Sequence, residues 1–421
     1  MKIWLINPYG PIPITGEDWR EYRFTIIGNY LSSLGHEVIW YTSSFSHHFK
    51  KQRSKGWKDI EINERFKIRL VPTPGYKKNI SFGRIFRDLV FSYKVFNEKD
   101  KQLDKPDFII YSESSLSFGY AGYKLARHYK IPVIYDQMDL WPELIINSFP
   151  SRIRKIINLM FYPVFLNRKK TYNDLDGFIS LAEPYLSIPL AIAPILKDKP
   201  HEVIYNGIDV IKFRENRTPN KELLNLLPLK MENEIWFVFA GTLGPSYDIL
   251  NLLKVAKLII KDGDQRIKII LAGDGPLKKE VNEFIHNNNG EVVSYLGQLK
   301  PEYLADLYKY CDVGLSTYTQ ISNVEMPDKF YDYTAAGMPI INSLTGEIGR
   351  IISAKDIGFN YKAGDTQELY TKIFNLVNET AIRKTMAEKS YGLGLVYDKN
   401  NQIQKLGSLM GEIIKRRNLI K

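Results

Sequence analysis

Short apolar runs alternate with segments of helical periodicity along the whole chain. The runs predict strands at 2–7, 37–42, 67–71, 107–111, 132–135 and 177–181, and again at 235–240, 267–272, 292–296, 313–316 and 339–342. Helical spacing of apolar residues lies between them, for example at 19–34, 118–129, 250–261, 277–286 and 302–310. Such an alternation is typical of parallel sheets that helices cover on both faces. The pattern therefore predicts an α/β protein with two doubly wound, Rossmann-like domains.

The break between the two sets of elements lies near 195–208, where a Lys-Asp-Lys-Pro run interrupts the pattern. We predict one Rossmann-like domain at 1–200 and a second at 201–398. A last helix, within 399–421, is expected to pack back at the domain junction. Ligands of doubly wound sheets bind beyond the carboxyl ends of the strands, so the site is expected in a cleft between the domains.

Composition narrows the class of protein and its compartment. Of 421 residues, 44% are hydrophobic and 25% are charged, which excludes disordered, collagen-like and disulfide-scaffold proteins. The single cysteine, Cys311, allows no internal disulfide and indicates a reducing compartment. No secretory signal is visible, and the most apolar stretch, 179–196, contains Glu183 and three prolines, so we reject it as a membrane span. We expect a cytoplasmic protein.

Ordered motifs in the second half resemble the donor domain of glycosyltransferase family 4, the retaining sugar-nucleotide enzymes of the two-Rossmann GT-B fold. The motifs occur in the order Tyr-Asn-Gly-Ile-Asp at 205–209, Leu-Ala-Gly-Asp-Gly-Pro at 271–276, Tyr-Leu-Gly-Gln-Leu at 295–299 and Met-Pro-Asp-Lys-Phe-Tyr-Asp-Tyr-Thr-Ala-Ala-Gly-Met-Pro at 326–339. The first half resembles the fucosamine-transferase-like branch through Arg23, Gly-His-Glu-Val at 35–38, Ser-Phe-Ser-His at 44–47 and Asp-Leu-Trp-Pro-Glu at 139–143.

The resemblance implies a set of donor-nucleotide residues in the second half. These are Asp332, Glu325, Gly241, Thr242, Gly297, Gln298 and Leu299. Asp332 stands where the family has a glutamate that accepts hydrogen bonds from both ribose hydroxyls, and aspartate offers the same acceptors. At the position of the family's second glutamate, this chain has Val324. Either the loop is shifted by one residue and Glu325 makes the contact, or the contact is missing. Alternatively, Asp332 is a carboxylate favoured near the start of a helix.

A phosphate-binding loop is expected after the first strand of the second half. Gly241 and Thr242 open it, and glycine lets a phosphate approach the backbone and the following helix N-terminus. The family usually has an Arg or Lys in this loop, but this chain does not. Lys329 is the first candidate for the missing cation, and a solvated surface lysine is the alternative. Gln298 and Leu299, with Gly297, resemble the loop that holds the nucleobase edge, although a plain strand-to-helix turn has the same residues.

Candidates for the acceptor side lie in the first half. Asp139 follows the strand at 132–135, and we name it with Lys329 as catalytic because its carboxylate can orient the acceptor hydroxyl or take up its proton. Its alternative is a helix N-cap before Trp141-Pro142. Further acceptor-side candidates are Arg23, Glu113 and His47. Alternatively, Arg23 is a charge on a helix surface and Glu113 is a charge in a loop. No metal-ligand spacing is present, so neither a metal nor another cofactor is expected.

The positive charge is concentrated in the first half. The net charge of the whole chain is +11. Residues 1–200 contain 30 Lys/Arg and 20 Asp/Glu, whereas residues 201–421 contain 28 Lys/Arg and 27 Asp/Glu. One apolar run, 156–165, is flanked by a basic set predicted to face a membrane surface: Arg152, Arg154, Lys155, Arg168, Lys169 and Lys170. A core helix with solvated ends is the alternative. Nucleic acid is ranked below an anionic membrane because no nucleic-acid motif accompanies the charge.

Together these features predict a retaining glycosyltransferase, peripheral at the inner face of the plasma membrane. It would transfer a hexose or N-acetyl-(deoxy)hexosamine from a UDP-sugar to a lipid-linked (polyprenyl diphosphate) glycan in surface polysaccharide synthesis. Three alternatives remain open: a GDP-sugar (mannosyl-type) transferase, a two-Rossmann UDP-sugar epimerase, and a non-catalytic sugar-nucleotide-binding protein.

Overall fold

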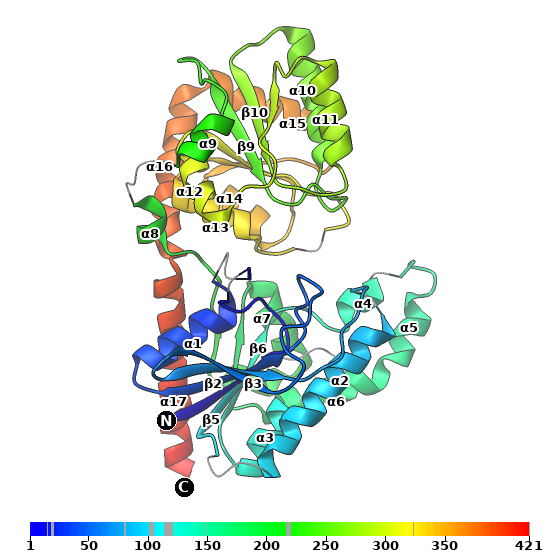
Figure 1. Ribbon diagram of the computed structural model, residues 1–421, viewed down its shortest axis with the longest axis vertical. Helices are drawn as coiled ribbons and strands as arrows, with labels where there is room; N and C mark the ends of the chain where they lie inside the picture. Colours follow the sequence, from blue (N-terminus) through cyan, green and yellow to red (C-terminus); the bar gives the residue numbers. More distant parts are fainter. Residues whose placement is uncertain are drawn as a thin grey trace. The chain divides into compact units, whose positions relative to one another are not determined.

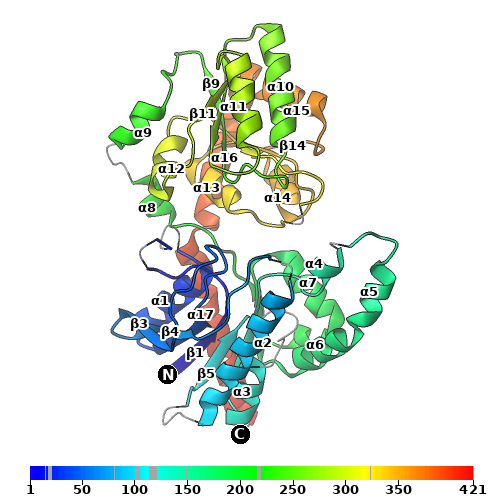
Figure 2. The same ribbon diagram turned by 45° about the vertical axis from the view of Figure 1, so that its right-hand side comes forward.

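The chain folds into two compact units, which the computed structural model in Figures 1 and 2 describes except for residues 15, 18–20, 80, 101–104, 113–120, 148, 216–219, 323 and 421. Unit 1 comprises Met1–Tyr205 together with Ile403–Lys421, and unit 2 comprises Asn206–Gln402. Each unit is built on its own sheet with helices packed on it (Figures 1 and 2). The predicted class of two parallel-sheet α/β domains is confirmed.

Unit 1 is built on a sheet of eight strands in the order β3-β4-β2-β1-β5-β6-β7-β8. The strands are β1 (Lys2–Ile6), β2 (Glu37–Ser43), β3 (Lys58–Asn63), β4 (Phe66–Val71), β5 (Phe108–Tyr111), β6 (Val133–Gln137), β7 (Gly177–Ser180) and β8 (His201–Val203). The helices are α1 (Arg23–Ser33), α2 (Phe82–Asn97), α3 (Gly122–Tyr129), α4 (Glu143–Asn147), α5 (Arg154–Met160), α6 (Tyr162–Asp174), α7 (Glu183–Ile192) and, from the end of the chain, α17 (Lys399–Ile420), with short 3-10 turns at Glu98–Asp100 and Pro194–Asp198.

Unit 2 is built on a parallel sheet of six strands in the order β11-β10-β9-β12-β13-β14. The strands are β9 (Ile235–Ala240), β10 (Ile267–Ala272), β11 (Val293–Tyr295), β12 (Val313–Ser316), β13 (Ile340–Asn342) and β14 (Gly358–Asn360). The helices are α8 (Val210–Arg214), α9 (Lys221–Leu226), α10 (Ile249–Asp262), α11 (Lys278–Asn287), α12 (Pro301–Tyr308), α13 (Asp328–Ala336), α14 (Glu347–Lys355), α15 (Thr366–Asn378) and α16 (Thr380–Val396).

Strand β3 is a departure from the predicted all-parallel sheet of the first half. It pairs antiparallel with β4, at the edge of the unit 1 sheet. Its isoleucines alternate with charged residues and its burial alternates accordingly, so it shows no continuous apolar run. An edge strand with one solvated face has this pattern, whereas the buried parallel strands are nearly all apolar. Strands β8 and β14 were also not predicted, because each contains only one large apolar residue and shows no apolar run.

The last helix, α17, packs on the sheet of unit 1. Its Leu406, Met410 and Ile413 are buried in one apolar cluster with Ile134 of β6 and Ile179 of β7. The close approach depends on Gly177, because a Cβ there would lie 2.5 Å from Cδ1 of Ile413. The chain therefore returns to unit 1 after completing unit 2.

Candidate functional site

In unit 2, the loops after β9, β10 and β11 meet through their backbones. The amide of Gly241 donates to the carbonyl of Ala272 (2.8 Å), and that of Gly273 donates to the carbonyl of Gly297 (2.7 Å). A Cβ at Gly273 would lie 1.8 Å from the carbonyl oxygen of Gly241, and both glycines have positive φ, 140° and 153°. Both φ values favour glycine, and at Gly273 a side chain would also push the two loops apart. The loops thus form one backbone surface at the carboxyl edge of the sheet.

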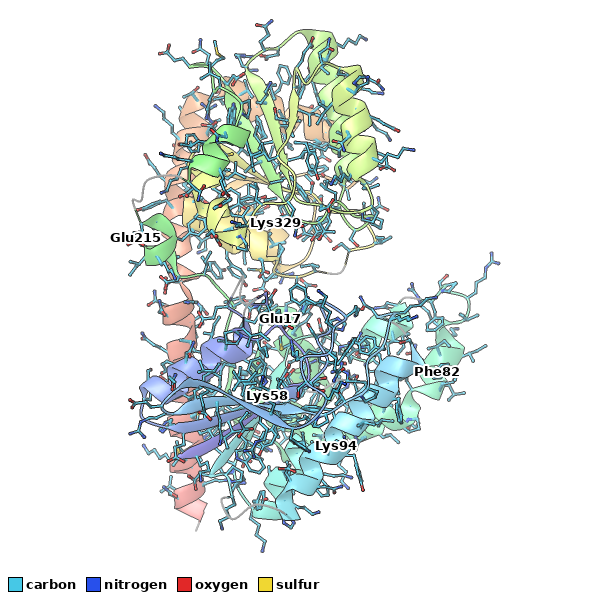
Figure 3. The ribbon with its side chains drawn as sticks, in the orientation of Figure 1. Glu17, Lys58, Phe82, Lys94, Glu215 and Lys329 are labelled. Carbon is cyan, nitrogen blue, oxygen red and sulfur yellow. The ribbon has the colours of Figure 1, made fainter. Side chains whose placement is uncertain are left out.

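Lys329 places its ammonium on this surface. It is the second residue of α13, near which it is labelled in Figure 3, and it is 7% exposed. A Cβ on Gly241 would lie 2.5 Å from Lys329 Nζ, so the ammonium lies directly against the glycine of the β9 loop. The same nitrogen lies 4.7 and 4.4 Å from the ring centroids of Phe239 and Tyr247, whose faces stabilise a cation. Lys329 therefore brings to the loop the positive charge that the loop sequence lacks, and the solvated surface position is not observed.

Asp332 lies on the same face of α13 as Lys329. The two residues are three positions apart, which places neighbouring side chains one above the other on a helix. Asp332 is 6% exposed. The helix is held by Tyr333, whose hydroxyl donates to the carbonyl oxygens of Val238 and Leu315 (both 3.2 Å). A ribose contact of Asp332 remains a prediction, and its place beside the Lys329 ammonium suits one.

Glu325 contacts the start of α14, and its predicted contact with the nucleotide remains a prediction. Its Oε2 accepts a hydrogen bond from the backbone amide of Glu347 (2.9 Å), at the first residue of α14. A Cβ on Gly346 would lie 2.2 Å from the same oxygen. A carboxylate at this position satisfies an unpaired helix amide and interacts favourably with the helix dipole. The structure thus uses Glu325 to cap α14.

The remaining predicted donor residues lie in the two exposed loops of this surface. Thr242 is exposed in the loop after β9. Gln298 is exposed and Leu299 is half-buried, and both follow Gly297 in the loop after β11. Nothing lies within 4 Å of a Cβ built on Gly297, so there is open space beside it. Their contacts with a nucleotide remain predictions.

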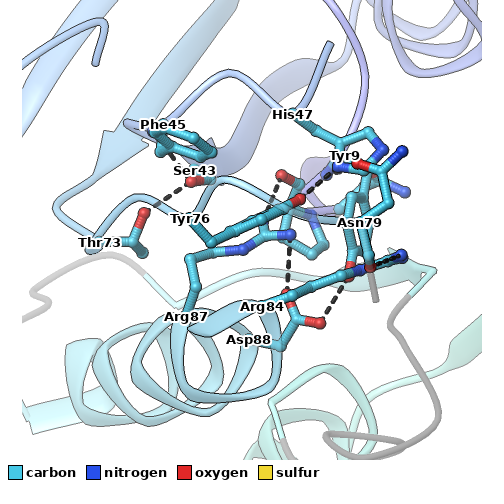
Figure 4. Close-up of polar contacts among 12 residues, drawn as sticks. Tyr9, Ser43, Phe45, His47, Thr73, Tyr76, Asn79, Arg84, Arg87 and Asp88 are labelled. Carbon is cyan, nitrogen blue, oxygen red and sulfur yellow. Dashed lines mark hydrogen bonds and ion pairs between the residues drawn. The ribbon is translucent and has the colours of Figure 1, made fainter. Parts of the chain in front are cut away.

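In unit 1, residues from three strand ends and one helix form a polar cluster, shown in part in Figure 4. Tyr9 follows β1, His47 and Lys50 follow β2, Tyr76 follows β4, and α2 contributes Arg84, Arg87 and Asp88. We call these seven residues the Arg84 cluster. The carboxyl ends of parallel strands are where a doubly wound sheet binds its ligands, so the Arg84 cluster lies where a site is expected.

Asp88 holds the inner part of the Arg84 cluster together. Its carboxylate accepts a hydrogen bond from the hydroxyl of Tyr9 (2.5 Å) and pairs with the guanidinium of Arg87 (2.8 Å). Arg87 is 0% exposed, donates to the carbonyl of Pro8 (3.0 Å), and lies 4.4 Å from the centroid of the Tyr9 ring. Burial and the Asp88 carboxylate raise the pKa of Tyr9. Arg87 and Asp88 therefore form a buried framework.

Arg84 and His47 form the outer part of the cluster. Arg84 donates to the hydroxyl of Tyr9 (3.1 Å) and lies 4.9 Å from the ring centroids of both Tyr9 and Trp141. His47 hydrogen-bonds through Nδ1 to the hydroxyl of Tyr76. Desolvation, followed by the charges of Lys50 and Arg84, lowers the pKa of His47 to about 3, so its ring is neutral at physiological pH. A neutral His47 offers one donor and one acceptor, as an acceptor-side residue requires.

Asp139 lies beside this cluster, after β6. Its position is exposed, yet the surrounding protein desolvates the carboxylate and raises its pKa, while the Arg84 charge acts in the opposite direction. The carbonyl of Asp139 accepts a hydrogen bond from the side chain of Gln137. A raised pKa near a cation suits a group that exchanges protons, and the catalytic role of Asp139 remains a prediction.

Arg23 is buried in an ion pair and does not present its charge to an acceptor. Its guanidinium binds both oxygens of Asp136 (2.6 and 2.9 Å) and donates to the carbonyl of Ile204 (2.5 Å). Arg23 is 5% exposed and Asp136 is 0% exposed. A bidentate pair of this kind ties α1 to the end of β6, so the structure gives Arg23 a framework role. Glu113, another acceptor-side candidate, lies outside the described residues.

The apolar run at 156–165 is exposed. Every residue of α5 is at least partly exposed, and Ile156, Leu159 and Met160 are 62, 74 and 70% exposed. The core-helix alternative is therefore wrong for α5. Of the basic flank, Arg152, Lys155, Lys169 and Lys170 are exposed, and half-buried Arg154 donates to the carbonyls of Phe149 and Asn147.

Arg168 corrects the predicted membrane set. It is 3% exposed and pairs through both terminal nitrogens with Glu143 (2.8 and 2.7 Å). Because burial and this pairing hold its guanidinium, Arg168 is not available to a membrane surface. The sequence motifs do not single out Tyr9, Tyr76, Arg84, Arg87 or Asp88. Tyr9 and Tyr76 follow the strands β1 and β4, and this position could have indicated them.

Two features are absent from the described residues. No group of three or more His, Cys, Asp or Glu side chains in that part of the chain is arranged to hold a metal ion. Likewise, among the helices described, none is both long enough and apolar enough to cross a membrane.

Comparison with known families gives two matches that together cover most of the chain. Residues 22–212 match the model for Glycosyltransferase Family 4, and residues 228–392 match the model for Glycosyl transferases group 1. Among curated proteins, the alpha-monoglucosyldiacylglycerol synthase of Streptococcus pneumoniae is 25% identical over 319 residues. That match covers 72% of this chain and 66% of the relative, so the chain spans about two thirds of its length.

Solved structures share the fold along the whole chain. The sucrose-phosphate synthase of Thermosynechococcus elongatus superposes with a TM-score of 0.69 at 16% identity, covering 99% of both chains. Anabaena HepE in complex with UDP superposes with a TM-score of 0.66 at 15% identity, covering 98% of this chain and 100% of that one. With these folds and the two family matches, this chain belongs to glycosyltransferase family 4 and has the GT-B fold.

Proposed function

We propose that this protein is a retaining glycosyltransferase that moves a hexose or N-acetyl-(deoxy)hexosamine from a UDP-sugar to a lipid-linked glycan in surface polysaccharide synthesis. The observation that carries the proposal is the buried Lys329 ammonium lying against Gly241, on the same helix as buried Asp332. A cation against a glycine loop at the carboxyl edge of a Rossmann-like sheet suits the diphosphate of a sugar nucleotide. The family membership supports glycosyl transfer.

Names of similar proteins support the finer assignments. Anabaena HepE has been crystallised with UDP and with UDP-glucose, and the pneumococcal relative is named for a glucosylated diacylglycerol. The proposed chemistry needs positioning and charge stabilisation, in which Lys329 stabilises the departing diphosphate. Asp139 then orients the acceptor hydroxyl. We propose that the transfer needs no metal ion, so EDTA would leave its rate unchanged.

The test of the proposed function is acceptor-dependent release of nucleotide. The full chain is incubated with UDP-sugars, with and without membrane lipid extract, and UDP and free sugar are measured. UDP release only in the presence of lipid supports the transferase. Isomerised donor without UDP release would instead indicate an epimerase, and binding without turnover would indicate a sugar-nucleotide-binding protein. A parallel thermal-shift series with UDP, GDP, ADP and dTDP identifies the base, and a preference for GDP would indicate the GDP-sugar alternative.

Replacement of Asp332 by alanine is expected to weaken UDP binding about 10- to 100-fold. Loss of hydrogen bonds to a charged acceptor costs about 1.5–3 kcal/mol. Calorimetric titration of UDP and of uridine measures the effect, which should be equal for the two ligands because both contain the ribose. Asp328→Ala, which removes an exposed carboxylate from the first turn of the same helix, is the control. Unchanged affinity in Asp332→Ala would remove the ribose assignment.

Unit 1 is proposed to bind an anionic membrane surface through α5 and the start of α6. Exposed apolar residues there lie beside exposed basic ones, as in interfacial segments. Co-sedimentation with vesicles containing phosphatidylglycerol is expected at low salt, and it should weaken as salt rises. Replacing both Leu159 and Met160 by serine should abolish it, whereas replacing exposed Leu229 of unit 2 should not. If the protein bound neutral vesicles as well as anionic ones at all salt concentrations, the proposed attraction between basic residues and anionic lipid would be wrong.

A further inference from the structure

The Arg84 cluster contains three cations, Lys50, Arg84 and Arg87, and only one carboxylate, Asp88. Asp88 pairs with Arg87. Arg84 and Lys50 instead use neutral partners: Arg84 donates to the carbonyl of Asn79 (3.0 Å) and to Tyr9, and Lys50 donates to Oδ1 of Asn79 (2.5 Å). Within the stretches that the structure describes, neither cation forms an ion pair. The two half-buried cations are thus held close together. The Asp88 and Asp139 carboxylates act on Arg84 from a longer distance, and no described carboxylate forms an ion pair with either cation.

Both cations are held in place before any ligand binds. Arg84 lies between the rings of Tyr9 and Trp141, and Lys50 Nζ lies 4.6 Å from the centroid of the Tyr76 ring. Lys50 has a φ of 54°, a left-handed conformation that is uncommon for lysine and costs free energy. The pKa of Lys50 is lowered by desolvation first and then by the Arg84 and Arg87 charges. An anion that bound here would relieve this repulsion.

The neighbouring surface of α2 indicates what kind of molecule would bring the anion. Phe82 and Phe86 are 89 and 60% exposed, whereas Arg84, between them in sequence, turns into the cluster; Figure 3 labels Phe82 near the end of this helix. Residues two apart on a helix do not share a face. A helix is about 10–12 Å across, so an anion at Arg84 would lie within about one helix diameter of these apolar side chains.

We propose that the Arg84 cluster binds the phosphate or diphosphate group of an amphipathic acceptor, with Arg84 and Lys50 as the contacting cations. Arginine and lysine are both suited to phosphate, arginine through paired hydrogen bonds and lysine as a point charge. From the anion at Arg84, the acceptor's hydrocarbon chain would pass around the first turns of α2 to reach the exposed Phe82 and Phe86. This inference rests on the proposed function, because it identifies the part of the lipid-linked acceptor that unit 1 recognises.

The test titrates the full chain, saturated with UDP to occupy unit 2, with geranyl diphosphate as a soluble probe. Arg84→Gln and Lys50→Gln are each expected to weaken its binding about tenfold or more, because each removes a charged hydrogen bond. Arg84→Lys should restore part of the affinity. Lys58→Gln, on the exposed edge strand β3, is the charge-matched control and should bind like the unaltered chain. Thermal unfolding and UDP affinity are measured for every variant. If an Arg84 variant does not fold, the variant of half-buried Lys50 still tests the site.

Vesicles of phosphatidylglycerol form the second arm and distinguish the two sources of phosphate. Unchanged vesicle binding together with lost geranyl diphosphate binding supports an acceptor site. If Arg84→Gln weakens vesicle binding but not geranyl diphosphate binding, the cluster recognises membrane headgroups and the acceptor assignment is overturned. Unchanged binding in both arms would overturn the anion site itself. Arg84-dependent binding without any UDP release from UDP-sugars would leave the anion site standing and remove the proposed function.

Discussion

Lys329→Met is expected to lower kcat/KM for the sugar-nucleotide donor about 100-fold or more while the protein remains folded. Removing one preoriented group that stabilises developing charge costs about 10²–10³ in rate. Methionine keeps an apolar stem of similar length and removes the ammonium that lies over the Phe239 and Tyr247 rings. Steady-state kinetics with varied UDP-sugar at saturating acceptor measures the effect, which should fall mainly on kcat because the charge on the departing diphosphate grows during the reaction.

The matched control for Lys329 is Lys279→Met. The Lys279 side chain is 83% exposed on α11, so its removal changes net charge equally without touching the glycine loops. Full activity in Lys329→Met would show that another group stabilises the diphosphate. A loss of activity that accompanies a lowered unfolding temperature would indicate a packing role, and Lys329→Arg would then test whether charge alone restores the rate.

Arg23→Ala is expected to destabilise unit 1 by about 3–5 kcal/mol, because removing one member of a buried ion pair leaves the other without compensation. Asp136 is 0% exposed and would lose both of its hydrogen bonds to the guanidinium. Burial raises the pKa of Asp136, so its carboxyl would take up a proton in this variant. Urea unfolding followed by tryptophan fluorescence measures the change. The curve is fitted with one transition for each unit, because multidomain proteins need not unfold in a single step.

The control for Arg23 replaces the pair as a whole. Arg23→Met combined with Asp136→Leu substitutes apolar groups for both charges and should recover most of the lost stability, since such replacements are often neutral or stabilising. Recovery of stability with recovery of UDP release supports a framework role. If Arg23→Ala instead abolished transfer without lowering the urea midpoint, the acceptor-side prediction for Arg23 would be correct and the framework assignment wrong.

Much of the fold is predictable because its signals are local. Buried parallel strands such as β9 and β10 are continuous apolar runs, and helices such as α10 have the helical period, so both could be placed from the pattern. Strand β3 was not predicted, because an alternation of apolar and polar residues at a sheet edge is a weaker signal than a continuous apolar run. The exposure of α5 could not be decided from its sequence either, since an apolar run with basic ends suits a core helix and an interfacial one equally.

The candidate site was predictable in its residue types and only partly in its geometry. Lys329 was named as a replacement for a missing loop cation, and the structure shows its ammonium against that loop although the two are far apart in sequence. Arg23 and Arg168 were named for their charge, but whether an arginine faces solvent or a buried carboxylate depends on contacts with distant residues. Sequence spacing contains no information on such partners.

By itself, then, the sequence determined the alternation of strands and helices, the family motifs of the second half and the excess of positive charge in the first. These features arise within short windows of chain or from simple counting. The tertiary structure decided which charges are available: it paired Arg23, Arg87 and Arg168 with carboxylates and left Arg84 and Lys50 with neutral partners. The physical reason is that burying an unpaired charge costs free energy. Whether a charged side chain is paired or available therefore depends on its neighbours, which only folding brings together.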